Sequence, residues 1–133
     1  MTSKSETEVP PKKILVVDDD PNICAIIEDY LIEIGENYGV DKAYNGKEGL
    51  DAVSKLKPDL IILDVMMPVM NGFSFLKSLK TNKEYCDVPV IMLTTKSDPP
   101  YLEKGLSLQA DFYLPKPFKM DNLMSFVNAI LKE

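Results

Sequence analysis

The chain has 133 residues, which is enough for one domain with a real hydrophobic core. Hydrophobic residues make up 45% of it and charged residues 27%, a balance typical of soluble globular proteins. Its 15 Lys and no Arg face 21 acids, and the formal net charge of −6 argues against direct binding of nucleic acid. No apolar run could cross a membrane, and the polar start is not a secretory signal. We therefore expect a cytoplasmic protein that binds neither nucleic acid nor a membrane.

Histidine is absent, and there are two cysteines, Cys24 and Cys86. The absence of His excludes Ser–His and Cys–His nucleophile pairs. It also removes the commonest transition-metal ligand, so a metal site would be rich in oxygen and suit Mg²⁺ or Ca²⁺ better than Zn²⁺. The cysteines fit no metal-binding or redox spacing, and we expect buried or incidental thiols.

Five short apolar runs predict strands, and helical patterns separate them. After a disordered tail over residues 1–12, we expect strands at 14–17, 38–44, 60–63, 90–93 and 112–114. We expect helices at 21–34, 46–56, 72–80, 97–108 and from about 121 onward. This alternation predicts an α/β fold, a doubly wound parallel sheet of five strands with five helices, in one domain over 13–133.

Local signals mark two helix starts. Asp20 before Pro21 combines an N-cap acceptor with a proline at the first helical position, so a capping role is enough to explain Asp20. Asn45–Gly46 opens the next helix, and Lys57–Pro58 ends it. The helix over 21–34 has apolar residues at helical spacing, which predict one buried face: Ile23, Ile26, Ile27, Tyr30, Leu31 and Ile34.

The expected strand over 60–63 indicates where a functional site would lie. Its four apolar residues are typical of a strand buried on both faces, and the run ends on the carboxylate of Asp64. In such sheets ligands bind beyond the carboxyl ends of the strands. Polar residues also follow three other strands: Asp18 and Asp19 the first, Thr94 the fourth and Lys116 the fifth.

Three carboxylates at one edge of a sheet repel one another unless a cation is present. Mg²⁺ is the natural cation, since it takes carboxylate oxygens and retains several waters. A pocket that also holds the ammonium of Lys116 and the hydroxyl of Thr94 suits a phosphoryl group. The alternative is that each acid has only a turn-forming or helix-capping role.

Four short motifs occur in an order that is far more specific than any one of them. They are Val17-Asp18-Asp19, the run from Leu63 to Gly72, Met92-Leu93-Thr94-Thr95 and Lys116-Pro117-Phe118. Over residues 13–131 the chain resembles the response-regulator receiver domains of two-component signalling (CheY-like domains). The resemblance implies a flavodoxin-like sheet with strand order 2-1-3-4-5 and a cis Lys116–Pro117 peptide bond.

The resemblance also implies a role for each matching residue. Asp64 would be the phospho-accepting nucleophile, and Lys116 would pair with the phosphoryl oxygens. Thr94 would form the switch hydrogen bond, and the ring of Tyr113 would change orientation with it. Mg²⁺ would be held directly by Asp19, mainly through water by Asp18, and by Asp64 and the backbone carbonyl of Met66.

The implied phosphoryl donor is a sensor histidine kinase or a phosphotransfer protein. Phosphorylation would change the surface formed by the fourth helix, the fifth strand and the last helix, which would bind a downstream protein. The chain ends soon after its last expected helix, so we expect protein contact to be the output. It would be a signalling switch that catalyses only its own phosphotransfer, not an enzyme with a separate substrate.

The chain departs from the family pattern at several positions. Gln109 stands where the family usually has Gly, and Pro99–Pro100 should shorten or shift the fourth helix. Met66, two residues after Asp64, and Lys96, two after Thr94, are not the acid or amide that orients water in members that hydrolyse quickly. We therefore expect slow self-dephosphorylation.

Three alternatives stay open at this point. A haloacid-dehalogenase-like phosphatase also forms an aspartyl phosphate, but its motif needs Thr or Val where this chain has Asn22, and it needs room for a cap domain. A flavodoxin-like flavin binder needs a Ser/Thr/Gly-rich loop, whereas residues 18–22 are mostly acidic. A receiver domain that acts by docking alone is the third, although Asp64, Thr94 and Lys116 are intact.

Overall fold

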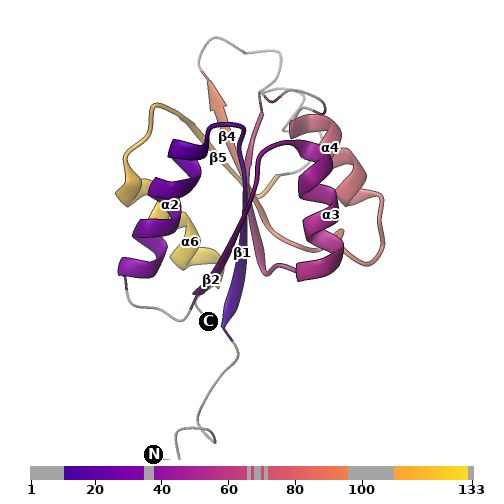
Figure 1. Cartoon of the computed structure of the whole chain (residues 1–133), viewed down its shortest axis with the longest axis horizontal. Coiled ribbons are helices and arrows are strands. Elements are labelled where there is room, and N and C mark those ends of the chain that lie inside the picture. The colour runs from indigo at the N-terminus through magenta and orange to yellow at the C-terminus, as the bar shows by residue number, and fades with distance from the viewer. Residues whose placement is uncertain are drawn as a thin grey trace, which may run out of the picture.

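The computed structural model describes residues 11–34, 38–65, 67, 70, 72–95 and 110–131. Five parallel strands form one sheet in the order β2-β1-β3-β4-β5 (Figure 1). The strands are β1 (Lys12–Val17), β2 (Tyr38–Ala43), β3 (Leu60–Asp64), β4 (Val90–Thr95) and β5 (Phe112–Lys116). The predicted doubly wound sheet and its strand order are confirmed.

Helices cover both faces of the sheet. Within the described residues they are α2 (Pro21–Glu33), α3 (Gly46–Leu56), α4 (Gly72–Lys80) and α6 (Met120–Leu131). α2 and α6 lie on one face, and α3 and α4 lie on the other (Figure 1). None of these helices is long and apolar enough to span a lipid bilayer. The helix expected over 97–108 lies outside the described residues, as do most of the expected tail, Met66, Lys96 and Gln109.

The predicted helix starts are confirmed by their capping hydrogen bonds. The carboxylate of Asp20 accepts a 2.9 Å hydrogen bond from the backbone N–H of Asn22, and Pro21 is the first residue of α2. At α3, the side chain of Asn45 accepts a 2.8 Å bond from the N–H of Glu48. Lys57 ends α3 in the left-handed conformation, with φ of 53°.

The sheet separates two hydrophobic clusters because its side chains alternate between the faces. Residues 14–17 and 60–63 are fully buried, so β1 and β3 are central strands as predicted. On the α2–α6 face, helix side chains complete a cluster with Ile14, Val16 and Ile62: Ile27, Leu31, Leu123 and Val127. On the α3–α4 face, they complete one with Leu15, Val17 and Leu63: Val53, Phe75, Leu76 and Leu79.

The predicted buried face of α2 is partly wrong. Its buried residues are Cys24, Ile27 and Leu31, at a spacing of three and four. Ile26, Tyr30 and Ile34 are exposed instead, at 44%, 39% and 37%. These three lie on one flank of the helix, beside the stripe that rests on the sheet. The helix therefore has more apolar residues than the sheet and α6 can cover.

β5 runs two residues further than expected, through Pro115 to Lys116. Proline cannot donate a ladder hydrogen bond, which is why the sequence pattern suggests an earlier end. β5 is the last strand of the sheet, and an edge strand tolerates Pro because one side of its backbone is unpaired. Lys116 is thus held in the sheet, opposite Thr95, not in a loop.

Candidate functional site

The ends of three strands bring Asp18, Asp64 and Lys116 together. Asp18 directly follows β1, Asp64 is the last residue of β3, and Lys116 is the last residue of β5. By alternation their side chains share the α2–α6 face with residues two positions earlier, which belong to its cluster: Val16, Ile62 and Leu114. The predicted convergence at one edge of the sheet is therefore a consequence of register.

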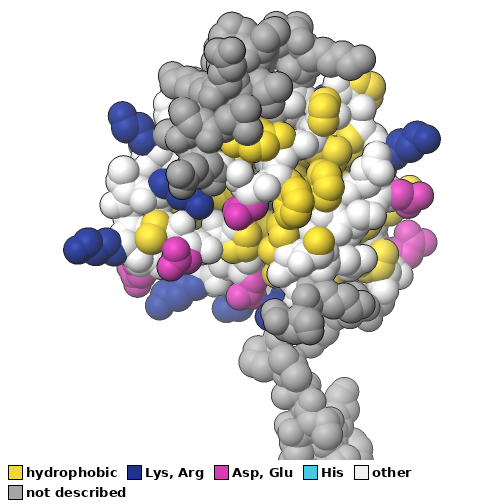
Figure 2. Space-filling view, turned by 180° about the vertical axis from the view of Figure 1, so that it is seen from behind, with side chains coloured by type: hydrophobic (Ala, Val, Ile, Leu, Met, Phe, Trp, Pro, Cys, Tyr) yellow, Lys and Arg dark blue, Asp and Glu magenta, His cyan; other side chains and the backbone are white. Residues whose placement is uncertain are grey.

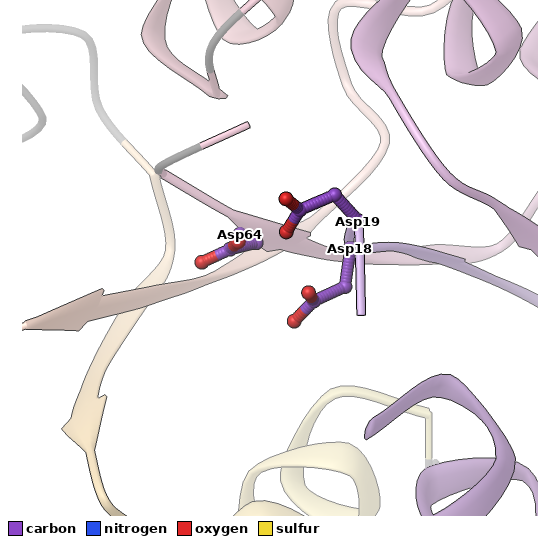
Figure 3. A group of neighbouring side chains, drawn as sticks. All are labelled: Asp18, Asp19 and Asp64. Atoms are coloured by element: carbon purple, nitrogen blue, oxygen red, sulfur yellow. The ribbon is translucent and has the colours of Figure 1, made fainter. Parts of the chain in front are cut away.

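The three acids form one compact cluster. Carboxylate oxygens of Asp18, Asp19 and Asp64 all lie within 4.8 Å of one another. Figure 3 shows Asp18 and Asp19 leaving the end of β1 and Asp64 the end of β3, with their carboxylates directed to the same side. Asp18 is fully buried and Asp64 is 3% exposed, whereas Asp19 is exposed. Water therefore screens the repulsion between Asp18 and Asp64 only weakly.

Within the described part of the chain, Lys116 is the cation that contacts this cluster. Its Nζ lies 3.1 Å from Oδ1 of Asp64 and 3.2 Å from Oδ2 of Asp18. The lysine side chain is 24% exposed, so its ammonium spans the boundary between the buried acids and solvent. The peptide bond from Lys116 to Pro117 is cis, as the resemblance implied. One ammonium leaves the three carboxylates with an excess of negative charge.

Backbone hydrogen bonds fix the position of Asp18. Its N–H donates to the carbonyl of Ala43 on β2 at 3.0 Å, and its Oδ1 accepts from the N–H of Asp20 at 3.0 Å. The buried thiol of Cys24 donates to its carbonyl at 3.4 Å. The sequence suggested only a capping role for Asp20, but its backbone also orients Asp18. An acid two residues before an N-cap at the end of a buried strand is the signal for this arrangement.

The ionisation of the cluster follows from its burial. Burial raises the pKa of Asp64 to about 6, and the neighbouring carboxylate of Asp18 adds to the effect while Lys116 opposes it. Burial also raises the pKa of Asp18. For Lys116, burial lowers the pKa, but the attraction of Asp64 and Asp18 outweighs it and the pKa is raised. The lysine is a permanent cation at neutral pH.

The donor set fits Mg²⁺. All three groups are carboxylates, the hard oxygen ligands that Mg²⁺ prefers, and the exposed Asp19 leaves a route for retained waters. A divalent cation would also balance the charge that Lys116 leaves. The fourth predicted ligand, the carbonyl of Met66, lies outside the described residues.

Thr94 and Tyr113 lie on the other side of the sheet. Thr94 is 5% exposed and stands one residue beyond Leu93, the register partner of Asp64. Tyr113 pairs with Met92, and both contact the α3–α4 cluster, so alternation puts Thr94 and Tyr113 on that same face. The hydroxyl of Tyr113 accepts a 3.1 Å hydrogen bond from the N–H of Ala110.

Comparison with known proteins identifies the chain. The family model described as response regulator receiver domain matches residues 14–128. The chain belongs to the response-regulator receiver family. The receiver domain is 38% identical over 121 residues to the DNA-binding response regulator MtrA of Mycolicibacterium smegmatis, a match that covers 91% of this chain and 51% of that protein. It spans about half the length of the curated relatives it matches.

Solved structures agree with this assignment. The chemotaxis protein CheY4 of Vibrio cholerae superposes with a TM-score of 0.82 at 36% identity, over 91% of this chain and 99% of that one. The receiver domain of the sensor histidine kinase PA1611 from Pseudomonas aeruginosa superposes with a TM-score of 0.82 at 27% identity, over 92% and 99% of the chains. That structure has a magnesium ion coordinated in the active site cleft. The receiver family thus replaces the phosphatase and flavin-binding alternatives.

An apolar groove of about 440 Å³ borders the acidic cluster of this receiver domain. Lys116 lies at the junction of the two, and the other lining residues are apolar: Ile23, Ile26, Pro117, Phe118 and Met120. The helical pattern of α2 does not predict this groove, because it places Ile26 in the core. The width of the apolar arc of α2 does indicate an exposed apolar surface, since the arc is wider than a helix lying on a sheet can bury.

Proposed function

We propose that this receiver domain is a phosphorylation switch in which Asp64 accepts a phosphoryl group from a phosphohistidine. The observation that supports this most strongly is the setting of Asp64. Its buried carboxylate stands at the end of a central strand, contacts Lys116 at 3.1 Å and lies beside the carboxylates of Asp18 and Asp19. The donor would be a sensor histidine kinase or a phosphotransfer protein.

The chemistry is the attack of a carboxylate on phosphorus. An oxygen of Asp64 forms a bond to phosphorus as the P–N bond to the donor imidazole breaks, and the imidazole nitrogen keeps that electron pair and takes up a proton. Lys116 holds phosphoryl oxygens and balances their charge, so catalysis is largely positioning and electrostatics. Mg²⁺, held by Asp18, Asp19, Asp64 and the carbonyl of Met66, would supply further charge neutralisation to the phosphoryl oxygens.

The switch would then run through Thr94 and Tyr113. The phosphoryl group adds a charge of about −1.5 to −2 beside Asp64, and the hydroxyl of Thr94 moves toward it to donate a hydrogen bond. Because Thr94 and Tyr113 share the α3–α4 face, the space that Thr94 leaves is open to the ring of Tyr113. That movement would break the hydrogen bond from Ala110 and alter the surface around β5.

The output surface would include β5 and α6, together with the helix expected over 97–108. Seen from behind, hydrophobic side chains gather in a patch on the side where β5 and α6 lie (Figure 2). The half-buried rings of Phe112 on β5 and Phe126 on α6 stack on each other, with centroids 4.5 Å apart. An exposed hydrophobic patch of this kind is typical of a surface that binds another protein. With a net charge of −6, we propose that this chain acts in the cytoplasm without itself contacting nucleic acid or a membrane.

The phosphorylated state would be long-lived, because neither Met66 nor Lys96 is the acid or amide that orients the attacking water in family members that hydrolyse quickly. The domain would therefore act as a switch that slowly resets, not as a turnover enzyme. We expect Met66→Glu to shorten the phosphorylated lifetime, measured as decay of the phosphorylated mass. A wild-type lifetime of only seconds, unchanged by this substitution, would contradict slow hydrolysis.

Intact-protein mass spectrometry after incubation with acetyl phosphate tests the proposal. We expect a single phosphoryl adduct that needs Mg²⁺ and is absent from Asp64→Asn. Asp51→Asn, which changes an exposed acid of α3, is the matched control and should be labelled like the wild type. No adduct on the wild type, from acetyl phosphate or from a panel of histidine kinases, would instead favour a receiver domain that acts by docking alone.

A further inference from the structure

The first residue of α4 lies directly against the backbone of Asp64. The N–H of Gly72 donates a 2.8 Å hydrogen bond to the carbonyl of Val65. A Cβ on residue 72 would overlap the carbonyl oxygen of Asp64 and would lie 2.8 Å from the Cα of Val65. Both neighbours are main-chain atoms, which cannot rotate away as a side chain can. Only glycine fits between α4 and the end of β3.

Pairing with β4 holds the backbone of Asp64 at the end of β3. Asp64 pairs with Leu93 of β4, and the N–H of Val65 donates to the carbonyl of Leu93 at 3.1 Å. Its carboxylate, on the opposite face of the sheet from α4, contacts Lys116. A side chain at residue 72 would therefore shift or rotate Asp64 relative to the ammonium, or push α4 away from the sheet.

The first residue of α3, Gly46, lies against Met70. A Cβ on Gly46 would lie 2.7 Å from both the Cβ and the carbonyl oxygen of Met70, two residues before Gly72. Gly72 thus lies against the backbone of Asp64 and Val65, and Gly46 lies against Met70. Gly46 and Gly72 are both buried.

We propose that Gly72, supported by Gly46, is a positioning residue that sets the direction of the Asp64 carboxylate. The inference rests on the proposed function, because Asp64 is taken as the phosphoryl acceptor. Without these side chains, α4 packs directly against the backbone of Asp64 and Val65 and α3 packs against Met70, which holds the carboxylate against Lys116. Displacing a reacting group by about 1 Å is enough to slow a reaction roughly a hundredfold.

The chain offers two matched controls. A Cβ on Gly49, in α3, would meet the side chains of Phe75 at 2.7 Å and Val17 at 3.3 Å, which belong to the core of the α3–α4 face. Gly49→Ala therefore crowds core side chains, and its nearest contacts do not include the backbone of Asp64 or Val65. A Cβ on Gly39 of β2 would meet nothing within 4 Å, so Gly39→Ala adds the same methyl group without crowding.

The test compares the four Gly→Ala variants with the wild type. Urea unfolding first shows the conditions under which each is fully folded. The rate of Mg²⁺-dependent phosphorylation by acetyl phosphate is then measured by intact mass, as a function of donor concentration. We expect Gly72→Ala to slow the maximal rate by about tenfold or more and Gly46→Ala to slow it less. Gly49→Ala and Gly39→Ala should keep the wild-type rate, even where Gly49→Ala lowers stability.

The outcomes separate this inference from the proposed function. Equal rates for folded Gly72→Ala and Gly49→Ala, with the wild type labelled normally, would overturn the positioning role alone. If Gly72→Ala does not fold, Gly46→Ala decides: a rate below that of Gly49→Ala supports the inference, and an equal rate overturns it. A wild type that takes no phosphoryl group would remove the proposed function and the inference together.

Discussion

The Nζ of Lys116 lies 3.1 Å from Oδ1 of Asp64, although β5 and β3 are not neighbours in the sheet. β4 lies between them, and the lysine side chain reaches across its end to the acid. The same ammonium lies 3.2 Å from Asp18 of β1. One flexible side chain therefore ties three strand ends together, and several consequences of this arrangement can be measured.

Removal of Lys116 should destabilise the domain. Lys116→Gln leaves the buried carboxylates of Asp18 and Asp64 without their cation, and we expect the free energy of unfolding to fall by about 2–4 kcal/mol at pH 7 without Mg²⁺. Urea unfolding measures this, with Lys119→Gln, at an exposed lysine, as the control. Adding Asp64→Asn to Lys116→Gln should recover part of the loss. Equal stability of Lys116→Gln and Lys119→Gln would show that the ion pairs contribute nothing.

The stability of the metal-free domain should rise as the pH falls. The pKa of Asp64 is raised from 3.8 to about 6 in the folded state, so the folded state binds a proton that the unfolded state has released. The resulting stabilisation is complete below pH 3.8 and is lost as the pH rises through about 6. For Asp64 alone, the free energy of unfolding is about 2–3 kcal/mol larger at the acidic end of this range than at the neutral end.

Urea unfolding in the presence of a chelator, between pH 5 and 7.5, measures this dependence. Asp64→Asn should flatten the profile over that range, because the amide does not titrate, whereas Asp51→Asn should leave it unchanged. A wild-type domain that is more stable at pH 7.5 than at pH 5 would contradict a raised pKa of Asp64 in the folded state.

Mg²⁺ should stabilise the domain at neutral pH. A ligand that binds only the folded state adds about 2.7 kcal/mol at a concentration one hundred times its dissociation constant. We expect thermal denaturation to show an increase in Tm at pH 7.5 that is smaller at pH 5, where protons compete for Asp64 and Asp18. Asp19→Asn should weaken the effect, and Asp20→Asn, which keeps a capping side chain, should not. An identical Mg²⁺ response in both variants would argue against Asp19 as a ligand.

The apolar groove beside Lys116 should contribute to recognition of a protein donor. Under the proposed function a donor would bring its phosphohistidine to Asp64, so its surface would cover the adjoining rim, which Ile26 helps to form. We expect Ile26→Glu to slow transfer from a purified phosphohistidine protein by about tenfold while leaving phosphorylation by acetyl phosphate unchanged. Ile32→Glu, at a 59% exposed residue of α2 outside the groove, is the matched control. Equal losses in both variants, or a loss with acetyl phosphate, would contradict donor docking in the groove.

The sequence predicts the central part of this fold well because β1 and β3 are buried on both faces. Residues 14–17 and 60–63 are wholly apolar, so no polar residue indicates a strand with one exposed face. Asp18 and Asp64 then mark where the two runs end. The parallel sheet then brings the ends to one edge, so the acidic cluster follows from the strands alone. Asp20 and Asn45 fix the helix starts through local hydrogen bonds that need no tertiary information.

The predictions from sequence are wrong at positions where burial or strand length depends on tertiary packing. Ile26, Tyr30 and Ile34 satisfy the helical period, yet only a narrow stripe of α2 can reach the sheet, and the period does not say how wide that stripe is. Pro115 suggests a strand end, but an edge position allows β5 to continue to Lys116. The contact between Gly72 and the carbonyl of Asp64 depends on how closely α4 approaches β3, which no local pattern encodes.

The most direct test of the central claim is to locate the phosphoryl group on the chain. After phosphorylation with acetyl phosphate and Mg²⁺, borohydride reduces an acyl phosphate to an alcohol, and peptide mass spectrometry then identifies the converted residue. We predict that Asp64 alone is converted to homoserine. The conversion should occur only in the sample that is phosphorylated with acetyl phosphate and Mg²⁺ and then treated with borohydride. Conversion of Asp18 or Asp19 instead, or a phosphoryl adduct that leaves Asp64 unconverted, would contradict the account.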